Sequence, residues 1–225
     1  MRVLVACEYS GAVRDEFAAL GHDAWSCDLL PSDVGGKHLQ GDVAQFLGMD
    51  WDLMVAHPPC TYLASSGLHW NNRIEGREEK TEKALEFVRL LMDAPIPHIC
   101  IENPIGRIGT AIRKADQYIQ PYDFGDDASK NTGLWLKNLP VLRATSYFPP
   151  RIVEKGEHAG KERWSNQTDS GQNRLGPSED RWKERSRTYP GIAKAMADQW
   201  GRGGLAVKTP DGEQFVFTFE GRRGA

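Results

Sequence analysis

The chain has 225 residues, of which 40% are hydrophobic and 26% are charged. This composition excludes a disordered or fibrous protein and is sufficient for the core of one large domain or two small ones. The formal net charge of -3 excludes a uniformly basic surface for nucleic acid, although it leaves room for a local basic patch.

The sequence predicts a cytoplasmic protein that does not enter a membrane. No apolar run approaches the roughly 18 residues that a membrane span requires, and the run before Cys7 is too short for a signal peptide. The four cysteines are far apart and include no Cys-x-x-Cys pair, so we expect reduced thiols rather than disulfides or zinc ligands. The histidines also lack metal-ligand spacing, and no metal site is expected.

The N-terminal half alternates between strand-like and helix-like segments. Short apolar runs typical of strands cover residues 2–6, 23–28, 52–56 and 98–101. Apolar residues recur with helical spacing over residues 13–20 and 78–94. Strands that alternate with crossover helices form a parallel sheet. The predicted fold is therefore α/β, with a doubly wound, mostly parallel sheet.

The second half has weaker periodicity. Candidate strands cover residues 118–124 and 132–136, and a helical pattern covers 191–200. A polar stretch without a clear period predicts a small irregular subdomain, and alternating phenylalanines after a Pro-Asp-Gly turn predict a C-terminal hairpin. We therefore divide the chain into an α/β domain at 1–148, a short irregular region at 149–190, a returning helix at 191–204 and a hairpin at 205–225.

Polar residues follow several of the predicted strands. The segments Glu8-Tyr9-Ser10-Gly11, His57-Pro58-Pro59-Cys60 and Glu102-Asn103-Pro104 each end a strand, and Asp28 and Asp42 are single acids at strand ends. Ligands of an open parallel sheet bind beyond the carboxyl ends of its strands. We therefore expect these segments to form one functional site.

Two side chains in these segments have the chemistry of catalytic groups. Cys60 follows two prolines, which restrict its backbone, and its thiol is either a nucleophile or a small apolar side chain that fills space. We expect Cys7, Cys27 and Cys100 to be core residues. Burial at a strand end is expected to raise the pKa of Glu102, which makes it a general acid; the alternative is a carboxylate that caps backbone amides.

Asp28 lies about 20 residues after the first turn, where an acid can bind ribose hydroxyls or can cap a loop. The first turn has only Ser10-Gly11-Ala12 and no Gly-x-Gly-x-x-Gly, which argues against a dinucleotide. A nucleotide-cofactor oxidoreductase is therefore disfavoured.

The segment from Trp164 to Tyr189 mixes basic, aromatic and amide side chains. Such a mixture can contact DNA phosphates and stack on bases. Acidic residues lie between the basic ones, so a solvated surface is the alternative. The candidate DNA contacts are Arg174, Arg181, Arg185 and Arg187.

Taken together, these segments resemble the DNA cytosine-5 methyltransferase family, and in particular its compact phage-type branch. The resemblance covers residues 1–201. It rests on the segments Pro58-Pro59-Cys60-Thr61-Tyr62-Leu63-Ala64, Glu102-Asn103-Pro104, 130–137 (KNTGLWLK) and 185–193 (RSRTYPGIA), in this order. It implies a methyltransferase-type, Rossmann-like fold, with residues 1–148 as the catalytic domain and 149–190 as a short DNA-contacting, target-recognition-like region. For a phage protein it also implies a location in the cytoplasm of the host bacterium.

The resemblance also implies a mechanism. Cys60 adds to carbon 6 of a cytosine flipped out of DNA, and Glu102 protonates or hydrogen-bonds ring N3, so that carbon 5 accepts a one-carbon unit. The implied donor is S-adenosylmethionine. Its implied contacts are Tyr9, Gly11, Asp28, Asp42 and Pro58.

The chain departs from the family pattern at several positions. The first turn lacks a second glycine, Thr61 replaces a glutamine, and Lys130 or Lys137 stands in for an arginine of a missing Gln-x-Arg-x-Arg strand. Two alternatives therefore stay open. One is hydroxymethylation of cytosine with methylenetetrahydrofolate, and the other is a non-catalytic DNA-binding relative.

Overall fold

A computed structural model describes residues 1–71, 73–176, 178, 181–202, 206–208 and 214–216. Its centre is a seven-stranded sheet with the order β3-β2-β1-β4-β5-β7-β6. The strands are β1 (Arg2–Ala6), β2 (Asp23–Asp28), β3 (His38–Gln40), β4 (Leu53–Ala56), β5 (His98–Pro104), β6 (Gln117–Ile119) and β7 (Thr132–Lys137).

Neighbouring strands from β3 to β5 are parallel, and β7 is antiparallel to both β5 and β6. The doubly wound, mostly parallel sheet predicted from the sequence is therefore confirmed. The strand predicted over 118–124 is shorter than expected, because β6 ends at Ile119 and the 3-10 turn η2 (Pro121–Asp123) follows. Pro121 has no backbone N–H to donate to a sheet ladder.

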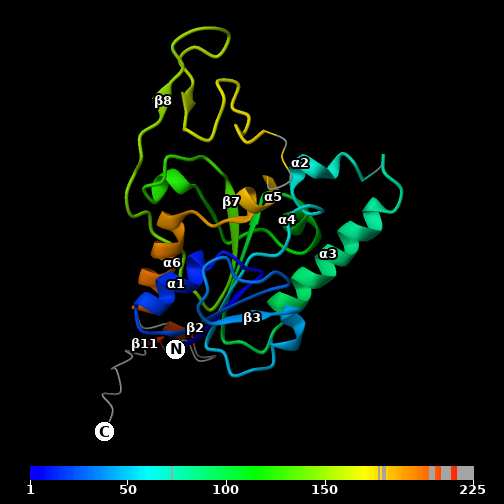
Figure 1. Cartoon of the computed structure of the whole chain (residues 1–225), viewed down its shortest axis with the longest axis vertical. Helices are drawn as coiled ribbons and strands as arrows, with labels where there is room; N and C mark the ends of the chain where they lie inside the picture. The colour runs from blue at the N-terminus through cyan, green and yellow to red at the C-terminus, as the bar shows by residue number, and fades with distance from the viewer. Residues whose placement is uncertain (72, 177, 179–180, 203–205, 209–213, 217–225) are drawn as a thin grey trace.

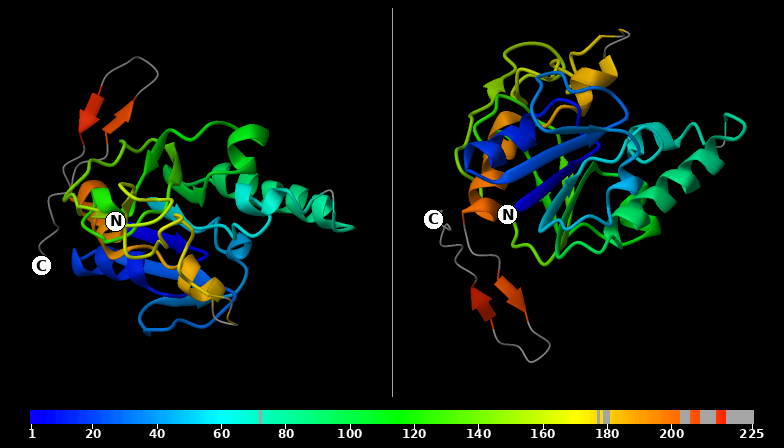
Figure 2. Two further views of the ribbon diagram at one scale, coloured as in Figure 1. Left: turned by 90° about the horizontal axis from the view of Figure 1, so that it is seen from above. Right: turned by 60° about the horizontal axis from the view of Figure 1, so that its bottom comes forward.

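Helices cover both faces of the sheet (Figures 1 and 2). On one face α1 (Ala12–Ala19) and α6 (Pro190–Gly201) pack against Val3 and Val5, and on the other α3 (Arg77–Met92) packs near Leu4 and Ala6. Successive side chains of a strand point to opposite faces, so a continuous apolar run such as β1 supplies both cores. The shorter helices are the 3-10 turn η1 (Val43–Gln45), α2 (Ser65–Leu68), α4 (Arg107–Ala111) and α5 (Arg181–Ser186).

The irregular region lies beyond the carboxyl ends of the strands and rises at the top of Figure 1. Its regular structure is the short antiparallel pair β8 (Arg151–Ile152) and β9 (Glu162–Arg163), and Trp164 stacks on Tyr122 with ring centroids 4.0 Å apart. This stacking ties the region to the main domain. The subdomain boundaries stay a prediction.

The predicted C-terminal hairpin is present as an antiparallel pair of strands, β10 (Ala206–Lys208) and β11 (Gln214–Val216). Its predicted Pro-Asp-Gly turn, and Phe217 and Phe219, lie outside the described residues. Across the part of the chain that is described, no helix has the length and apolar character needed to cross a membrane.

Candidate active site

A cavity of about 790 Å³ lies at the carboxyl ends of β1 and β4. Loops after these strands supply Tyr9, His57 and Cys60, and α5 supplies Trp182 and Arg185. Residues far apart in the sequence therefore meet at the edge of the sheet where the sequence predicted a site.

The backbone around Cys60 is held firmly. Asn103, which is buried, donates from Nδ2 to the Pro58 carbonyl at 2.7 Å, and the backbone N–H of Arg107 donates to the Leu63 carbonyl at 2.7 Å. These bonds dock the loop after β4 onto the turn after β5. The Cys60 thiol is free and half-buried.

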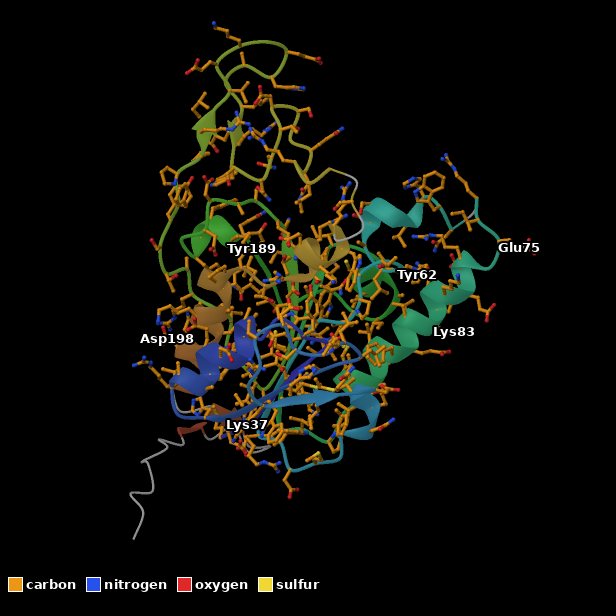
Figure 3. All side chains as sticks on the ribbon, viewed as in Figure 1. Lys37, Tyr62, Glu75, Lys83, Tyr189 and Asp198 are labelled. Atoms are coloured by element: carbon orange, nitrogen blue, oxygen red, sulfur yellow. The ribbon has the colours of Figure 1, made fainter. Side chains whose placement is uncertain are left out.

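The segment after Cys60 is also anchored on α3. Figure 3 shows Tyr62 beside α3. The ring of Tyr62 lies under the guanidinium of Arg77, at 4.9 Å, and near the ammonium of Lys80, at 5.8 Å. The hydroxyl of Thr81 donates to the Tyr62 carbonyl at 3.2 Å. The loop that carries Cys60 is therefore fixed on both sides.

Glu102 differs from its predicted state. Burial raises the pKa of Glu102, but the charge of Lys130, the hydrogen bond and charge of His57 and a hydrogen bond from Thr132 together outweigh burial and hold that pKa below its ordinary value. The expectation of a raised pKa is wrong, because the sequence did not reveal these partners. Glu102 is therefore a carboxylate that accepts hydrogen bonds at neutral pH.

The sequence analysis placed His57 in one of the site segments but assigned it no catalytic role. Its Nδ1 atom lies 3.0 Å from Oε2 of Glu102, and the two side chains are only 6% and 13% exposed. The other ring nitrogen, Nε2, is buried and has no hydrogen-bond partner among the described residues. His57 lines the cavity, whereas Glu102 is not among the lining residues. The available signal was a polar residue, His57, directly after a buried strand, but His57 was considered only as a metal ligand.

The two candidate lysines lie at opposite ends of β7. Lys130 is close enough to lower the pKa of Glu102, and its Nζ donates to the carbonyl of Arg185 at 3.3 Å. Lys137 instead donates to the Ala94 carbonyl at 3.0 Å, at the other end of the strand. Lys130 is therefore the lysine that belongs to this site.

A second cavity of about 330 Å³ adjoins the first and shares Cys7, Asp28, Leu29 and Pro59 with it. It is mostly apolar and is also lined by Asp42 and Pro58. One oxygen of Asp28 accepts the Leu30 N–H at 2.9 Å, and one oxygen of Asp42 accepts the Ala44 N–H at 3.0 Å. One oxygen of Asp28 therefore caps the loop, as the alternative interpretation expected, and the other oxygen accepts no hydrogen bond from the described residues.

Tyr9 and Gly11, the two predicted cofactor contacts in the first turn, differ in where they lie. Tyr9 lines the first cavity, and its hydroxyl donates to the carbonyl of Lys183 at 3.0 Å. Gly11 lines neither cavity, and a Cβ atom placed on it meets Nη2 of the buried Arg14 at 2.5 Å. The left-handed φ of 76° at Gly11 therefore serves close packing at the start of α1. Its cofactor contact stays a prediction.

Cys7 is not a simple core residue, because it lines both cavities. Burial, and then the charge of Asp28, raises the pKa of Cys7 far above its ordinary value, so its thiol is inert. Cys27 and Cys100 are buried, as expected. Within the described segments no cluster of three His, Cys, Asp or Glu side chains is arranged to hold a metal.

The four candidate DNA contacts line different hollows of the surface. Arg185 lines the cavity that holds Cys60. Arg174 lines one depression with Arg181 and another with Arg187, and Arg187 is ion-paired with Asp33 at 2.7 Å. Arg185 is therefore the one of the four positioned beside the candidate nucleophile.

Comparisons with known proteins find partial likenesses to solved structures. No known family model and no curated protein matches the chain. Among the solved structures that match part of it are a putative DNA modification methyltransferase encoded within a prophage of E. coli (TM-score 0.41, 16% identity) and the S. pombe Dnmt2 methyltransferase (TM-score 0.38, 17% identity). The matches cover 60% and 63% of this chain and 45% and 50% of theirs, so this chain spans about half the length of those proteins.

Proposed function

We propose that this protein methylates cytosine at carbon 5 in DNA through covalent addition of Cys60, with S-adenosylmethionine as the donor. One observation carries the proposal: a free cysteine on a rigid loop shares a cavity with a histidine bonded to a buried carboxylate, and an acid-lined cavity adjoins it. The first cavity suits a flipped pyrimidine and the second suits an adenosine.

The chain's own groups divide the work in this proposal. The Cys60 sulfur adds to carbon 6 of the ring, which makes carbon 5 nucleophilic. The proton required at ring N3 is delivered by the hydrogen-bonded pair that His57 forms with the Glu102 carboxylate. The Cys60 sulfur leaves after carbon 5 has been modified and has lost its proton.

The second cavity fits the adenosine part of S-adenosylmethionine. Asp28 and Asp42 have carboxylate oxygens suited to ribose hydroxyls and to an adenine amino group, and Val43 and Phe87 provide an apolar lining. S-adenosylmethionine supplies, when bound, an electrophilic methyl group. Because the two cavities share residues, a donor bound in the second cavity would lie next to Cys60, which supports this assignment.

DNA as the substrate is supported by the rim of the first cavity. Trp70 and Trp182 line it although they are 44% and 52% exposed, and Arg77 and Arg185 accompany them. Exposed aromatic rings beside guanidinium groups can stack on bases and contact phosphates. An unstacked cytosine is also the only form whose ring carbons a cysteine can reach.

The test is nucleoside mass spectrometry of unmodified DNA after incubation with the protein and each donor in parallel. We expect 5-methylcytosine with S-adenosylmethionine and none with C60A, while C100A serves as a control because Cys100 is buried away from the cavities. If the only product is hydroxymethylcytosine, formed with methylenetetrahydrofolate, the folate is the donor and Cys60 remains the nucleophile. Absence of both products from duplex and single-stranded DNA would refute the proposal and favour a non-catalytic DNA-binding protein.

A further inference from the structure

The unpartnered nitrogen of His57 is the strongest unexplained feature of the molecule. The side chain is 6% exposed, yet Nε2 finds no hydrogen-bond partner among the described residues. A buried polar atom without a partner costs about 1–3 kcal/mol, so such an atom on a cavity wall indicates a ligand that completes it. His57 lines the cavity that holds Cys60 and is absent from the wall of the acid-lined cavity.

The orientation of the ring follows from its other nitrogen. Glu102 is an acceptor at neutral pH, so His57 Nδ1 carries a proton and donates it across the 3.0 Å contact. A carboxylate that accepts from one nitrogen of a histidine fixes the ring and sets the chemistry of the other nitrogen. Nε2 is therefore the atom that this pair presents to the cavity.

The ionisable groups that face His57 come from several elements. Glu102 approaches from β5, and Glu8, at the end of β1, is close enough for the charge of His57 to act on it. Lys130 lies close to Glu102, and Cys60 lies on the same cavity wall as His57.

We propose that His57, through Nε2, is the group that contacts and protonates ring N3 of the cytosine, and that Glu102 is a positioning residue that acts through His57. This inference rests on the proposed function. It assigns the acid role to a residue that the resemblance does not mark, and it explains why Glu102 does not line the cavity.

The step balances in atoms and charge. The Cys60 thiolate forms a bond to carbon 6, the electron pair of the 5,6 double bond shifts toward carbon 4, and the pair displaced from the carbon 4–N3 double bond takes the proton from Nε2. A thiolate and an imidazolium thus become a neutral adduct and a neutral imidazole. The reverse proton transfer from N3 to Nε2 accompanies departure of the sulfur.

A double-mutant cycle tests the inference, with formation of the covalent adduct as the readout. An oligonucleotide that contains 5-fluorocytosine is used with S-adenosylmethionine, because fluorine cannot leave carbon 5 as a proton does and the adduct persists. We expect H57N to slow adduct formation about 100-fold and E102Q to slow it about tenfold. H57N/E102Q should be no slower than H57N, since Glu102 has nothing to act through once His57 is gone.

The control is H98N. His98 is also buried, at 7% exposed, and it lies at the other end of β5, where its Nδ1 bonds the Asn138 carbonyl at 2.7 Å. Its replacement removes a similar buried imidazole without touching either cavity, so H98N should form adduct at the wild-type rate. If E102Q slows the H57N protein as much as it slows the wild type, Glu102 acts directly and the inference is overturned.

A second readout requires no turnover. In protein labelled with ¹⁵N-histidine, we expect the His57 Nδ1–H signal to move in E102Q, and the Nε2 signal to move when a cytosine oligonucleotide binds. An Nε2 signal that ignores bound DNA overturns the inference even in an active enzyme. A wild-type protein that forms neither adduct nor modified base, while these signals behave as expected, refutes the proposed function and leaves the pairing of His57 with Glu102 standing.

Discussion

The contact between the Cys60 loop and the turn after β5 depends on the absence of a side chain at Gly106. A Cβ atom added there would meet the carbonyl oxygen of Leu63 and would lie 2.9 Å from Cα of Ala64. The φ of 172° at Gly106 is extended backbone that any residue adopts, so the cost of G106A is purely one of space. Backbone atoms cannot rotate away as a flexible side chain can, and the two segments must separate.

The magnitude follows from what this separation breaks. The N–H of Ser65 donates to the Ile105 carbonyl at 2.9 Å, and the N–H of Arg107 donates to the Leu63 carbonyl at 2.7 Å. Two net hydrogen bonds contribute about 1–3 kcal/mol, and overpacking costs a similar amount. The smaller entropy of the unfolded alanine chain offsets part of this cost. We therefore expect G106A to lower the free energy of unfolding by about 2–4 kcal/mol. Displacement of the Cys60 loop by about 1 Å should also slow adduct formation about 100-fold.

Gly109 provides the matched control, three residues away in α4. A Cβ atom there meets nothing within 4 Å, so G109A should stabilise the protein by about 0.5–1 kcal/mol through helix propensity. Urea denaturation of both variants measures the difference, and the opposite signs separate steric conflict from a general effect of alanine. Equal stability of G106A and G109A would refute the close packing of Gly106 against Leu63 and Ala64.

Three further predictions concern charge and reactivity. R185A should weaken DNA binding and reduce the slope of log K for DNA binding against log salt concentration by about 1. R187A should change this slope less, because the guanidinium of Arg187 is already ion-paired with Asp33. Equal slopes of the two variants in a titration of labelled DNA would contradict this prediction. Burial raises the pKa of Glu8, so the folded protein keeps this proton to higher pH than the unfolded chain does. As the pH falls from 7 toward the ordinary pKa of about 4.3, the free energy of unfolding of the wild type should therefore rise relative to that of E8Q. Parallel pH dependence of the two proteins would refute this prediction. Iodoacetamide at about pH 8 should alkylate Cys60 first, because burial raises the pKa of the other three thiols, and mass mapping that finds another cysteine labelled first would count against the site.

Local sequence pattern was sufficient for much of the fold. Strands buried on both faces appear as continuous apolar runs, so β1, β2 and β4 were predicted within one residue of their ends. The helices α1, α3 and α6 were predicted because each buries one face, which imposes a helical period on the sequence. The edge of the sheet that carries the site also followed from sequence, since the carboxyl ends of parallel strands lie together.

What local pattern does not contain is the set of partners that each polar side chain meets. Glu102 and His57 are 45 positions apart, and Tyr9 meets α5 over 174 positions. A pKa depends on charges within a few ångströms, so the direction of the Glu102 shift was decided by Lys130 and His57 once the sheet had assembled. The sequence by itself determined the sheet, its functional edge and Cys60 as the candidate nucleophile; the tertiary structure decided which side chains surround that cysteine, because only folding brings distant strand ends together.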